Sequence, residues 1–154
     1  DLVNAKRVVE EGVKVYPKFD DLFKVLRVIN QKNGEPVPID ESELLGMLQD
    51  GKVDEALARI EKDKKAFSGW CIFDENAMND AGYFLLLEKK DVEGAIKVFE
   101  LNTREFPDSP NTFDSLAEAH LLAGHRTEGI ENYRKAAAMG LENAKKMIKE
   151  LEGK

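Results

Sequence analysis

The chain has 154 residues, of which 42% are hydrophobic and 34% charged, and its formal net charge is −7. This composition is typical of a folded domain or a short repeat array, and it excludes a disordered chain. The acidic balance disfavours nucleic-acid and anionic-membrane partners, because both select for lysine and arginine. With Cys71 as its single cysteine, the chain forms no internal disulfide.

No apolar run is long enough to cross a bilayer, and no basic segment followed by an apolar stretch marks a signal peptide. We therefore expect a soluble protein, with the cytoplasm and the periplasm both open as its compartment. The chain begins with Asp1 rather than methionine. A domain cut from a longer protein and a processed form are therefore both open.

Two helices are predicted at the start of the chain. The first spans 2–16, where apolar residues recur at helical spacing until Pro17 ends the pattern. The second spans 19–32 and ends before Gly34. Its inward face is expected to hold Leu22, Val25, Leu26 and Ile29. Residues 35–40 contain two prolines and are predicted to form a non-helical connector.

Two further helices are expected up to residue 49 and over 53–66. Asp40 is placed to cap the first of them, and Glu43 completes a capping-box pattern. The inward residues of the second are Val53, Ala56, Leu57 and Ile60. The apolar connector 67–75 follows, and its large side chains are expected to fill a gap between neighbouring repeats. These side chains are Trp70, Ile72 and Phe73.

The second half of the chain has the more regular pattern. Helices are predicted at 75–89, 92–105, 110–123, 126–139 and 142–152. Ser109 followed by Pro110 is a strong start signal, with serine as the N-cap and proline at the first helical position. Gly124 and Gly140 lie just past helix ends, where a left-handed residue is favoured. No stretch shows the alternation of a β-strand, so the predicted fold is all-α.

Part of this half repeats with a period of 34 residues. Ala95, Ile96 and Phe99 are answered by Gly129, Ile130 and Tyr133. A small residue marks the closest approach of two paired helices, and a bulky residue one turn later fills the space beside it. Stacked hairpins of this kind bury a continuous core that one hairpin cannot bury alone. From Gly82 to Ala117 the spacing is 35, which predicts one extra residue in the turn of the first hairpin.

These positions resemble the tetratricopeptide repeat. The last repeat matches the family pattern with Phe113, Leu116, Ala117, His120, Gly124, Gly129, Tyr133 and Ala136. The repeat before it matches with Gly82, Ala95, Phe99 and Pro107. The resemblance implies an α-solenoid of about four helix pairs in a single domain, 1–154. We expect irregular repeats in 1–67 and two regular repeats in 76–152, the latter ending in a capping helix.

A narrower resemblance concerns residues 79–86 and 106–119. These segments look like the repeat tails that follow the catalytic domain in some bacterial serine hydrolases and esterases. Gly-x-Ser-x-Gly and Ser-x-x-Lys, the motifs of the hydrolases themselves, are absent from this sequence. The resemblance therefore implies an accessory role.

Catalytic, cofactor and metal sites are not predicted. His120 is expected to face the core and His125 to lie in a turn, and neither has a further ligand at metal-binding spacing. Cys71 lacks the second cysteine that dithiol chemistry requires. We therefore expect a protein that is not an enzyme.

In tetratricopeptide stacks the first helices line a concave face, which implies a peptide-binding or protein-binding groove in this chain. The residues expected to line it are Asn79, Tyr83, Asn111, Asp114, Glu118 and Leu121. Asp114 and Glu118 favour a neutral or basic partner over an acidic one. A plain solvated helix face is the alternative for each of these residues. The second functional hypothesis is an accessory domain that packs on, or oligomerises, a hydrolase domain of the same parent chain.

Overall fold

The computed structural model describes residues 2–16 and 20–153, and Pro17 lies outside this part of the chain. The described residues are helical with short connectors and contain no strand, so the predicted all-α class is confirmed. They form two compact units, 1–74 and 75–154, whose boundary falls inside the predicted connector 67–75. None of the described helices is both long and apolar enough to cross a membrane.

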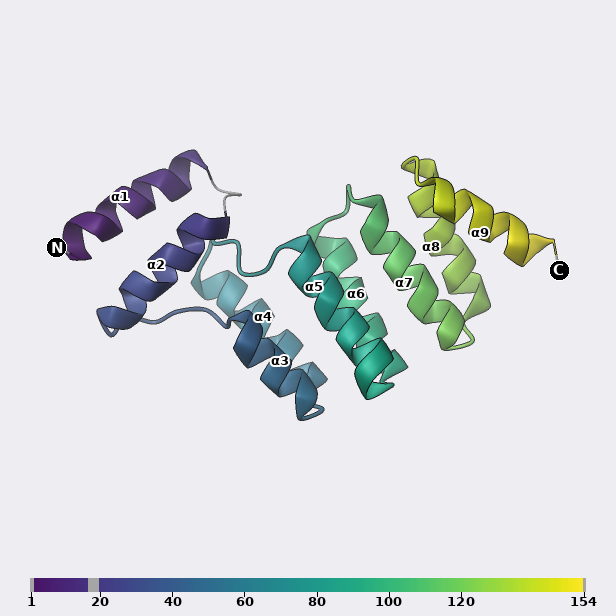
Figure 1. The fold of residues 1–154 in the computed structure, drawn as a ribbon, viewed down its shortest axis with the longest axis horizontal. Coiled ribbons are helices and arrows are strands. Elements are labelled where there is room, and N and C mark those ends of the chain that lie inside the picture. The colour runs from purple at the N-terminus through teal and green to yellow at the C-terminus, as the bar shows by residue number, and fades with distance from the viewer. Residues whose placement is uncertain (1, 17–19, 154) are drawn as a thin grey trace. The chain divides into compact units, whose positions relative to one another are not determined.

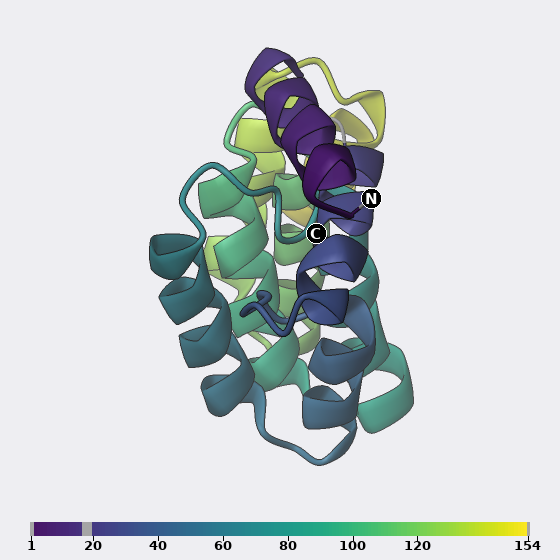
Figure 2. The same cartoon turned by 90° about the vertical axis from the view of Figure 1, so that its left-hand side faces the viewer.

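The helices of the first unit are α1 (Leu2–Val15), α2 (Asp20–Lys32), α3 (Glu41–Gln49) and α4 (Val53–Ala66). Helices α3 and α4 lie side by side as an antiparallel pair (Figures 1 and 2). The buried apolar residues of the pair include Leu44, Leu48, Val53, Ala56 and Ile60. The inward face predicted for α4 is thus largely confirmed, with Leu57 partly buried.

The inward face of α2 differs from the prediction. Val25 is 47% exposed, while Phe23, Leu26 and Ile29 are buried. The indole of Trp70 explains the difference, because its ring centroid lies 5.7 Å from that of Phe23. Helix α2 turns its larger aromatic side chain toward this contact, and Val25 consequently faces solvent.

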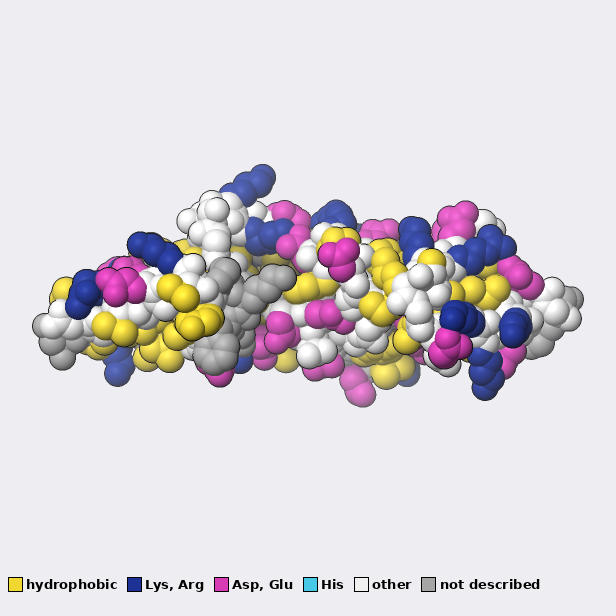
Figure 3. Space-filling model, turned by 90° about the horizontal axis from the view of Figure 1, so that it is seen from above, with side chains coloured by type: hydrophobic (Ala, Val, Ile, Leu, Met, Phe, Trp, Pro, Cys, Tyr) yellow, Lys and Arg dark blue, Asp and Glu magenta, His cyan; other side chains and the backbone are white. Residues whose placement is uncertain are grey.

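Helix α1 contacts its unit through both charged and apolar residues. None of its residues is buried. Large apolar side chains are open to solvent over this helix, as Figure 3 shows, and they include Leu2, Val3, Val8 and Val15. Lys6 pairs with Glu35 in the connector after α2. Gly12 faces α2, where an added Cβ would lie 3.2 Å from Leu22.

Charged side chains hold the non-helical connector between α2 and α3. Arg27 donates to the carbonyl oxygens of Pro38 and Ile39, the latter at 2.9 Å. The buried carboxylate of Asp63 accepts from the Ile39 N–H at 2.7 Å and from Arg59 at 2.8 Å. These side chains supply the partners that a connector without a helix or a sheet cannot give its own backbone.

The two helix starts singled out in the sequence are capped only partly as expected. Asp40 accepts from the Glu43 N–H at 2.9 Å as predicted, but the Glu43 carboxylate accepts from Arg59 at 3.0 Å instead of completing a capping box. Ser109 occupies its N-cap position without a side-chain cap bond. The hydroxyl of Thr112 donates to the Ser109 carbonyl oxygen at 2.9 Å and secures this turn.

The second unit contains α5 (Glu75–Tyr83), which continues as the π-helical segment η1 (Phe84–Lys89), and four further helices. These are α6 (Val92–Glu105), α7 (Pro110–Leu122), α8 (Arg126–Ala138) and α9 (Glu142–Glu152). Each packs against the next in the chain. In Figure 1, α5, α7 and α9 form the front layer of this unit, and α6 and α8 lie behind them.

The π-helical segment accounts for the 35-residue spacing. A π-helical hydrogen bond spans one more residue than an α-helical one, so the extra residue lies in η1 and not in the turn that follows it. The hydrogen bond that closes this helix end runs from the Asp91 N–H to the Leu85 carbonyl. At the next hairpin the corresponding bond, from His125 to His120, spans one residue fewer. Lys90 adopts the left-handed conformation here, with a φ of 57°.

Glycines at the hairpin contacts allow the paired helices to approach closely. A Cβ on Gly82 would lie 2.3 Å from the Phe99 ring, and one on Gly129 would lie 2.6 Å from Leu121. Ala95 and Ala117 are fully buried beside these contacts. The small positions of the repeat therefore set the distance between the helices.

We predict that Gly82→Ala lowers the free energy of unfolding by about 1–3 kcal/mol, because the new methyl group would collide with a fully buried ring. Combining it with Phe99→Leu should cost less than the sum of the two single changes, since the smaller side chain makes room. Urea denaturation of the three variants measures this coupling. Additive losses would show that the two residues do not share this contact.

We also predict that Gly124→Ala destabilises the protein by about 1 kcal/mol through its backbone alone. The φ of Gly124 is +82°, and an added Cβ would meet nothing within 4 Å. Gly46→Ala is the matched control, because Gly46 lies inside α3 and an added Cβ there also meets nothing within 4 Å. That change should stabilise the protein by about 0.5–1 kcal/mol. Thermal melts with opposite signs for the two variants are the expected result.

Candidate functional site

The repeat places two pairs of polar residues on the same side of successive helices. Asn79 and Tyr83 of α5 correspond to Asp114 and Glu118 of α7 at the 35-residue spacing. Residues four apart share one side of a helix, and equivalent positions of stacked hairpins face the same way. Two helices distant in sequence therefore bring these four side chains together.

Hydrogen bonds join these residues across α5 and α7. The Tyr83 hydroxyl donates to Glu118 Oε2 at 2.7 Å and also lies 3.4 Å from the Ser115 hydroxyl. Ser115, which is 2% exposed, donates in turn to Asn79 Oδ1 at 2.7 Å. We call Asn79, Tyr83, Asp114, Ser115 and Glu118 the polar cluster. Its internal bonds connect the two helices and fix the orientation of the Glu118 carboxylate.

Both tyrosines beside the carboxylates stay protonated at neutral pH. Burial, and then the Glu118 and Asp114 charges, raise the pKa of Tyr83 to about 12, although its bond with Ser115 opposes the shift. Burial and the same two carboxylates raise the pKa of Tyr133 in α8 to about 12. Tyr133 is only 4% exposed, and no described residue forms a hydrogen bond with its hydroxyl.

Asp114 is the least satisfied member of the polar cluster. Its Oδ1 atom is buried without a hydrogen-bond partner in the described structure. Burial and the neighbouring Glu118 charge raise the pKa of Asp114, while a hydrogen bond with Asn143 of α9 lowers it. Among the described residues no lysine or arginine forms an ion pair with Asp114 or Glu118. The face formed by α5 and α7 thus carries two carboxylates without a counter-charge.

The other two residues predicted for the groove have different surroundings. Asn111 is exposed at the start of α7 and donates to Glu75 Oε1 at 3.2 Å. Leu121 is partly buried against Gly129 and joins the apolar cluster around Tyr133. Four of the six predicted residues therefore belong to the polar cluster, and these two lie beyond it.

Sequence reasoning missed Ser115 and Tyr133 as members of this site. The sequence pattern assigns no role to Ser115, whereas its hydroxyl is the link between Asn79 and Tyr83. The repeat pattern indicates only a packing role for Tyr133. The available signal was the repeat itself, since Tyr133 occupies the position of Phe99 and adds a hydroxyl to it.

The remaining candidates for chemistry are His120, His125 and Cys71. Nδ1 of His120 lies 3.4 Å from Nδ1 of His125, and burial, followed by the His125 charge, lowers the pKa of His120. The thiol of Cys71 lies 3.7 Å from the Phe73 carbonyl oxygen. Within the described residues no group of three or more His, Cys, Asp or Glu side chains could hold a metal ion.

No protein-family model matches the chain, and a search of curated proteins gives no match. The resemblances to the tetratricopeptide repeat and to hydrolase tails therefore stay predictions.

We predict that Asp114→Asn stabilises the protein at neutral pH. Removing one of two like charges four residues apart on a helix gains about 0.2–0.5 kcal/mol. Because the pKa of Asp114 is raised by folding, ionised Asp114 costs stability above its folded pKa. The cost, and with it the advantage of the variant, disappears below the ordinary value of 3.8.

Urea denaturation of this variant at pH values above and below that range measures the effect. Asp80→Asn, a change on the exposed side of α5, is the control and should alter stability little in either condition. A loss of stability at neutral pH in Asp114→Asn would contradict the assignment of an uncompensated charge.

Proposed function

We propose that the chain is a non-catalytic interaction module whose α5 and α7 face binds a neutral or basic segment of another protein. The observation that carries this proposal is the pair of carboxylates, Asp114 and Glu118, without a counter-charge and with one buried oxygen unpartnered. A lysine or arginine side chain would supply both the charge and the hydrogen-bond donors that this face lacks.

The state of the polar groups supports binding over catalysis. A serine nucleophile needs a base that removes its proton, but the Ser115 hydroxyl donates to the amide oxygen of Asn79, which is not a base. The phenols of Tyr83 and Tyr133 have pKa values of about 12, so neither serves as a base at neutral pH. The α5 and α7 face presents hydrogen-bond acceptors that neighbouring side chains hold in place.

The energetic argument favours a cation over a merely neutral ligand. An ionised group that is partly buried without a partner raises the free energy of the unbound protein. A cation that pairs with Asp114 and Glu118 offsets this penalty. An anionic segment would add a third negative charge to the same face and is disfavoured.

The test uses a synthetic array of peptides matched in length and apolar content, with basic, neutral and acidic members. Basic peptides should bind most tightly, and added salt should weaken them most. The variant Asp114→Asn/Glu118→Gln keeps an acceptor for Tyr83 but removes both charges. It should lose about tenfold in affinity for the basic members.

Glu131→Lys, on an exposed position of α8, is the control and should leave the order of peptides unchanged. Melting curves for each variant report whether the fold is intact. A preference for acidic peptides, or equal binding by the neutralised variant, would refute the proposed role of this face.

A further inference from the structure

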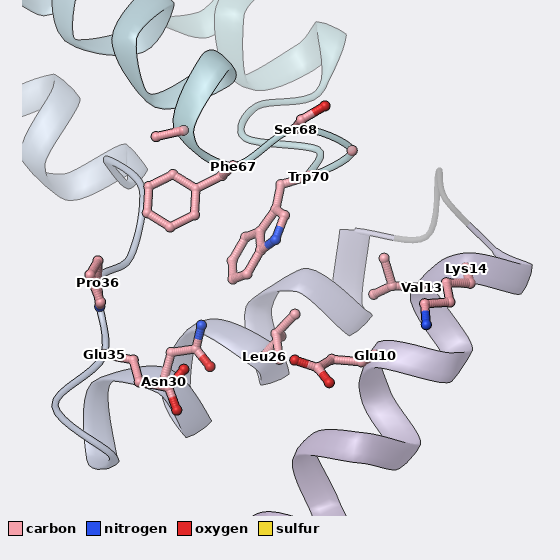
Figure 4. A pocket seen from close by; sticks show the side chains of 12 residues that line it. Glu10, Val13, Lys14, Leu26, Asn30, Glu35, Pro36, Phe67, Ser68 and Trp70 are labelled. Atoms are coloured by element: carbon pink, nitrogen blue, oxygen red, sulfur yellow. The ribbon is translucent and has the colours of Figure 1, made fainter.

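A cavity in the first unit shares no lining residue with the polar cluster. Its volume is about 790 Å³, which is within the range of small-molecule sites. Its apolar lining comes from α1, α2, the connector after α2 and the residues that follow α4. This lining includes Val13, Leu26, Pro36, Phe67 and Trp70. Figure 4 shows the Trp70 indole extending toward Leu26 and Asn30 of α2.

Asn30 gives this apolar cavity an unpaired polar group. The residue is 7% exposed, and its Oδ1 atom is buried without a partner. Its amide nitrogen likewise forms no hydrogen bond with a described residue and points into the space beneath Trp70 (Figure 4). A buried amide without partners costs folding free energy, so its presence calls for a reason other than stability.

The charges at the cavity rim balance one another. Glu10, Lys14 and Glu35 line the cavity, and Lys6 forms ion pairs with both Glu10 and Glu35. The hydrogen bond with Lys6 lowers the pKa of Glu35, and the same bond raises the pKa of Lys6. The two carboxylates are thus matched in number by the ammonium groups of Lys6 and Lys14, so the charges at and beside the rim give a charged ligand no net attraction.

Trp70 supplies a second hydrogen-bond donor, its indole N–H, and a fluorescent reporter. It is the single tryptophan of the chain, and its ring lies 5.5 Å from Phe67 and 5.7 Å from Phe23 between centroids. No described residue accepts a hydrogen bond from its indole N–H. An aromatic or alkyl ligand body would pack on these rings, while a polar head would reach the Asn30 amide.

We infer that this cavity binds a small uncharged molecule with an apolar body and a carboxamide head. The Asn30 nitrogen that points into the cavity (Figure 4) is a hydrogen-bond donor, and the oxygen of a carboxamide accepts from it while the head group stays uncharged. A carboxylate or an ammonium head would lose its hydration against the apolar walls, and an ammonium head would also offer the Asn30 nitrogen no acceptor. This site is independent of the peptide-binding face proposed above.

The experiment titrates the full chain with phenylbutanamide and follows Trp70 fluorescence. A ligand of this size should bind with a dissociation constant of about a millimolar or tighter. The charged analogues phenylbutanoate and phenylbutylammonium share the same apolar body and should bind about tenfold more weakly.

Asn30→Leu should weaken binding of the amide about tenfold without lowering the melting temperature, because it removes an unpaired buried group. Asn30→Ala removes the amide without adding volume, so it covers the case in which leucine overfills the cavity. Val25→Ala, on the exposed side of α2, is the control and should bind like the wild type.

Three results would overturn the inference. The first is a fluorescence response that does not saturate with the amide, and the second is equal or tighter binding of either charged analogue. The third is that both Asn30 variants bind the amide as tightly as the wild type, or that both melt well below it because the Asn30 amide has a structural partner. Peptide-array results at the α5 and α7 face do not bear on any of these outcomes.

Discussion

The close approach of antiparallel helices is the constraint on which the second unit depends. Two helices pack at this distance only where one of them lacks a side chain, and Gly82 and Gly129 supply these points against Phe99 and Leu121. The first unit uses the same device more loosely, since an added Cβ on Gly12 would meet only the end of Leu22. Once the spacing within a hairpin is fixed, the next hairpin stacks at a fixed displacement. That displacement places the Tyr83 hydroxyl oxygen 2.7 Å from Glu118 Oε2.

The polar cluster follows from the same stacking. Equivalent positions of neighbouring hairpins meet one another, so a polar residue at one of them needs a polar partner at the other. Tyr83 and Glu118 form a hydrogen bond in this way, and Ser115 forms one with Asn79. Asp114 does not have such a partner on α5, because Asn79 at the equivalent position bonds Ser115 through its Oδ1 and forms no hydrogen bond with Asp114 in the described structure. The surplus negative charge therefore results from one position where the repeat leaves an acid unmatched.

The sequence predicted the helices well because glycine, proline and the apolar spacing act locally. The left-handed glycines at 124 and 140 and the start of α7 at Pro110 needed no knowledge of the partner helices. The predictions were wrong where tertiary contacts determine the position or the orientation of a residue. The extra residue of the first hairpin entered η1 and not the turn, and Val25 faces solvent because Phe23 packs on Trp70.

The same limit applied to the site. The spacing of Asn79, Tyr83, Asp114 and Glu118 placed them on one side of the stack. It did not reveal that Ser115 would link two of them, since that bond depends on the distance between α5 and α7. Nor did it identify the amide of Asn30, which the helical pattern shows only as a polar residue next to Ile29. A polar group without a hydrogen-bond partner can be recognised only when the positions of all its neighbours are known.

Not every unpaired polar atom in the structure indicates a ligand. Asn102 is fully buried and its Oδ1 also lacks a partner, but its amide nitrogen donates to the Glu75 carbonyl oxygen at 3.1 Å. That bond ties α6 to the start of α5, so Asn102 has a structural role that offsets the cost of its unpaired oxygen. Asn30 has no such bond and borders a cavity large enough for a ligand. Asp114 lies between these cases, because Asn143 engages its carboxylate while one oxygen stays unpaired beside a second negative charge. This contrast is the physical reason for proposing binding at Asn30 and at Asp114 and a packing role for Asn102.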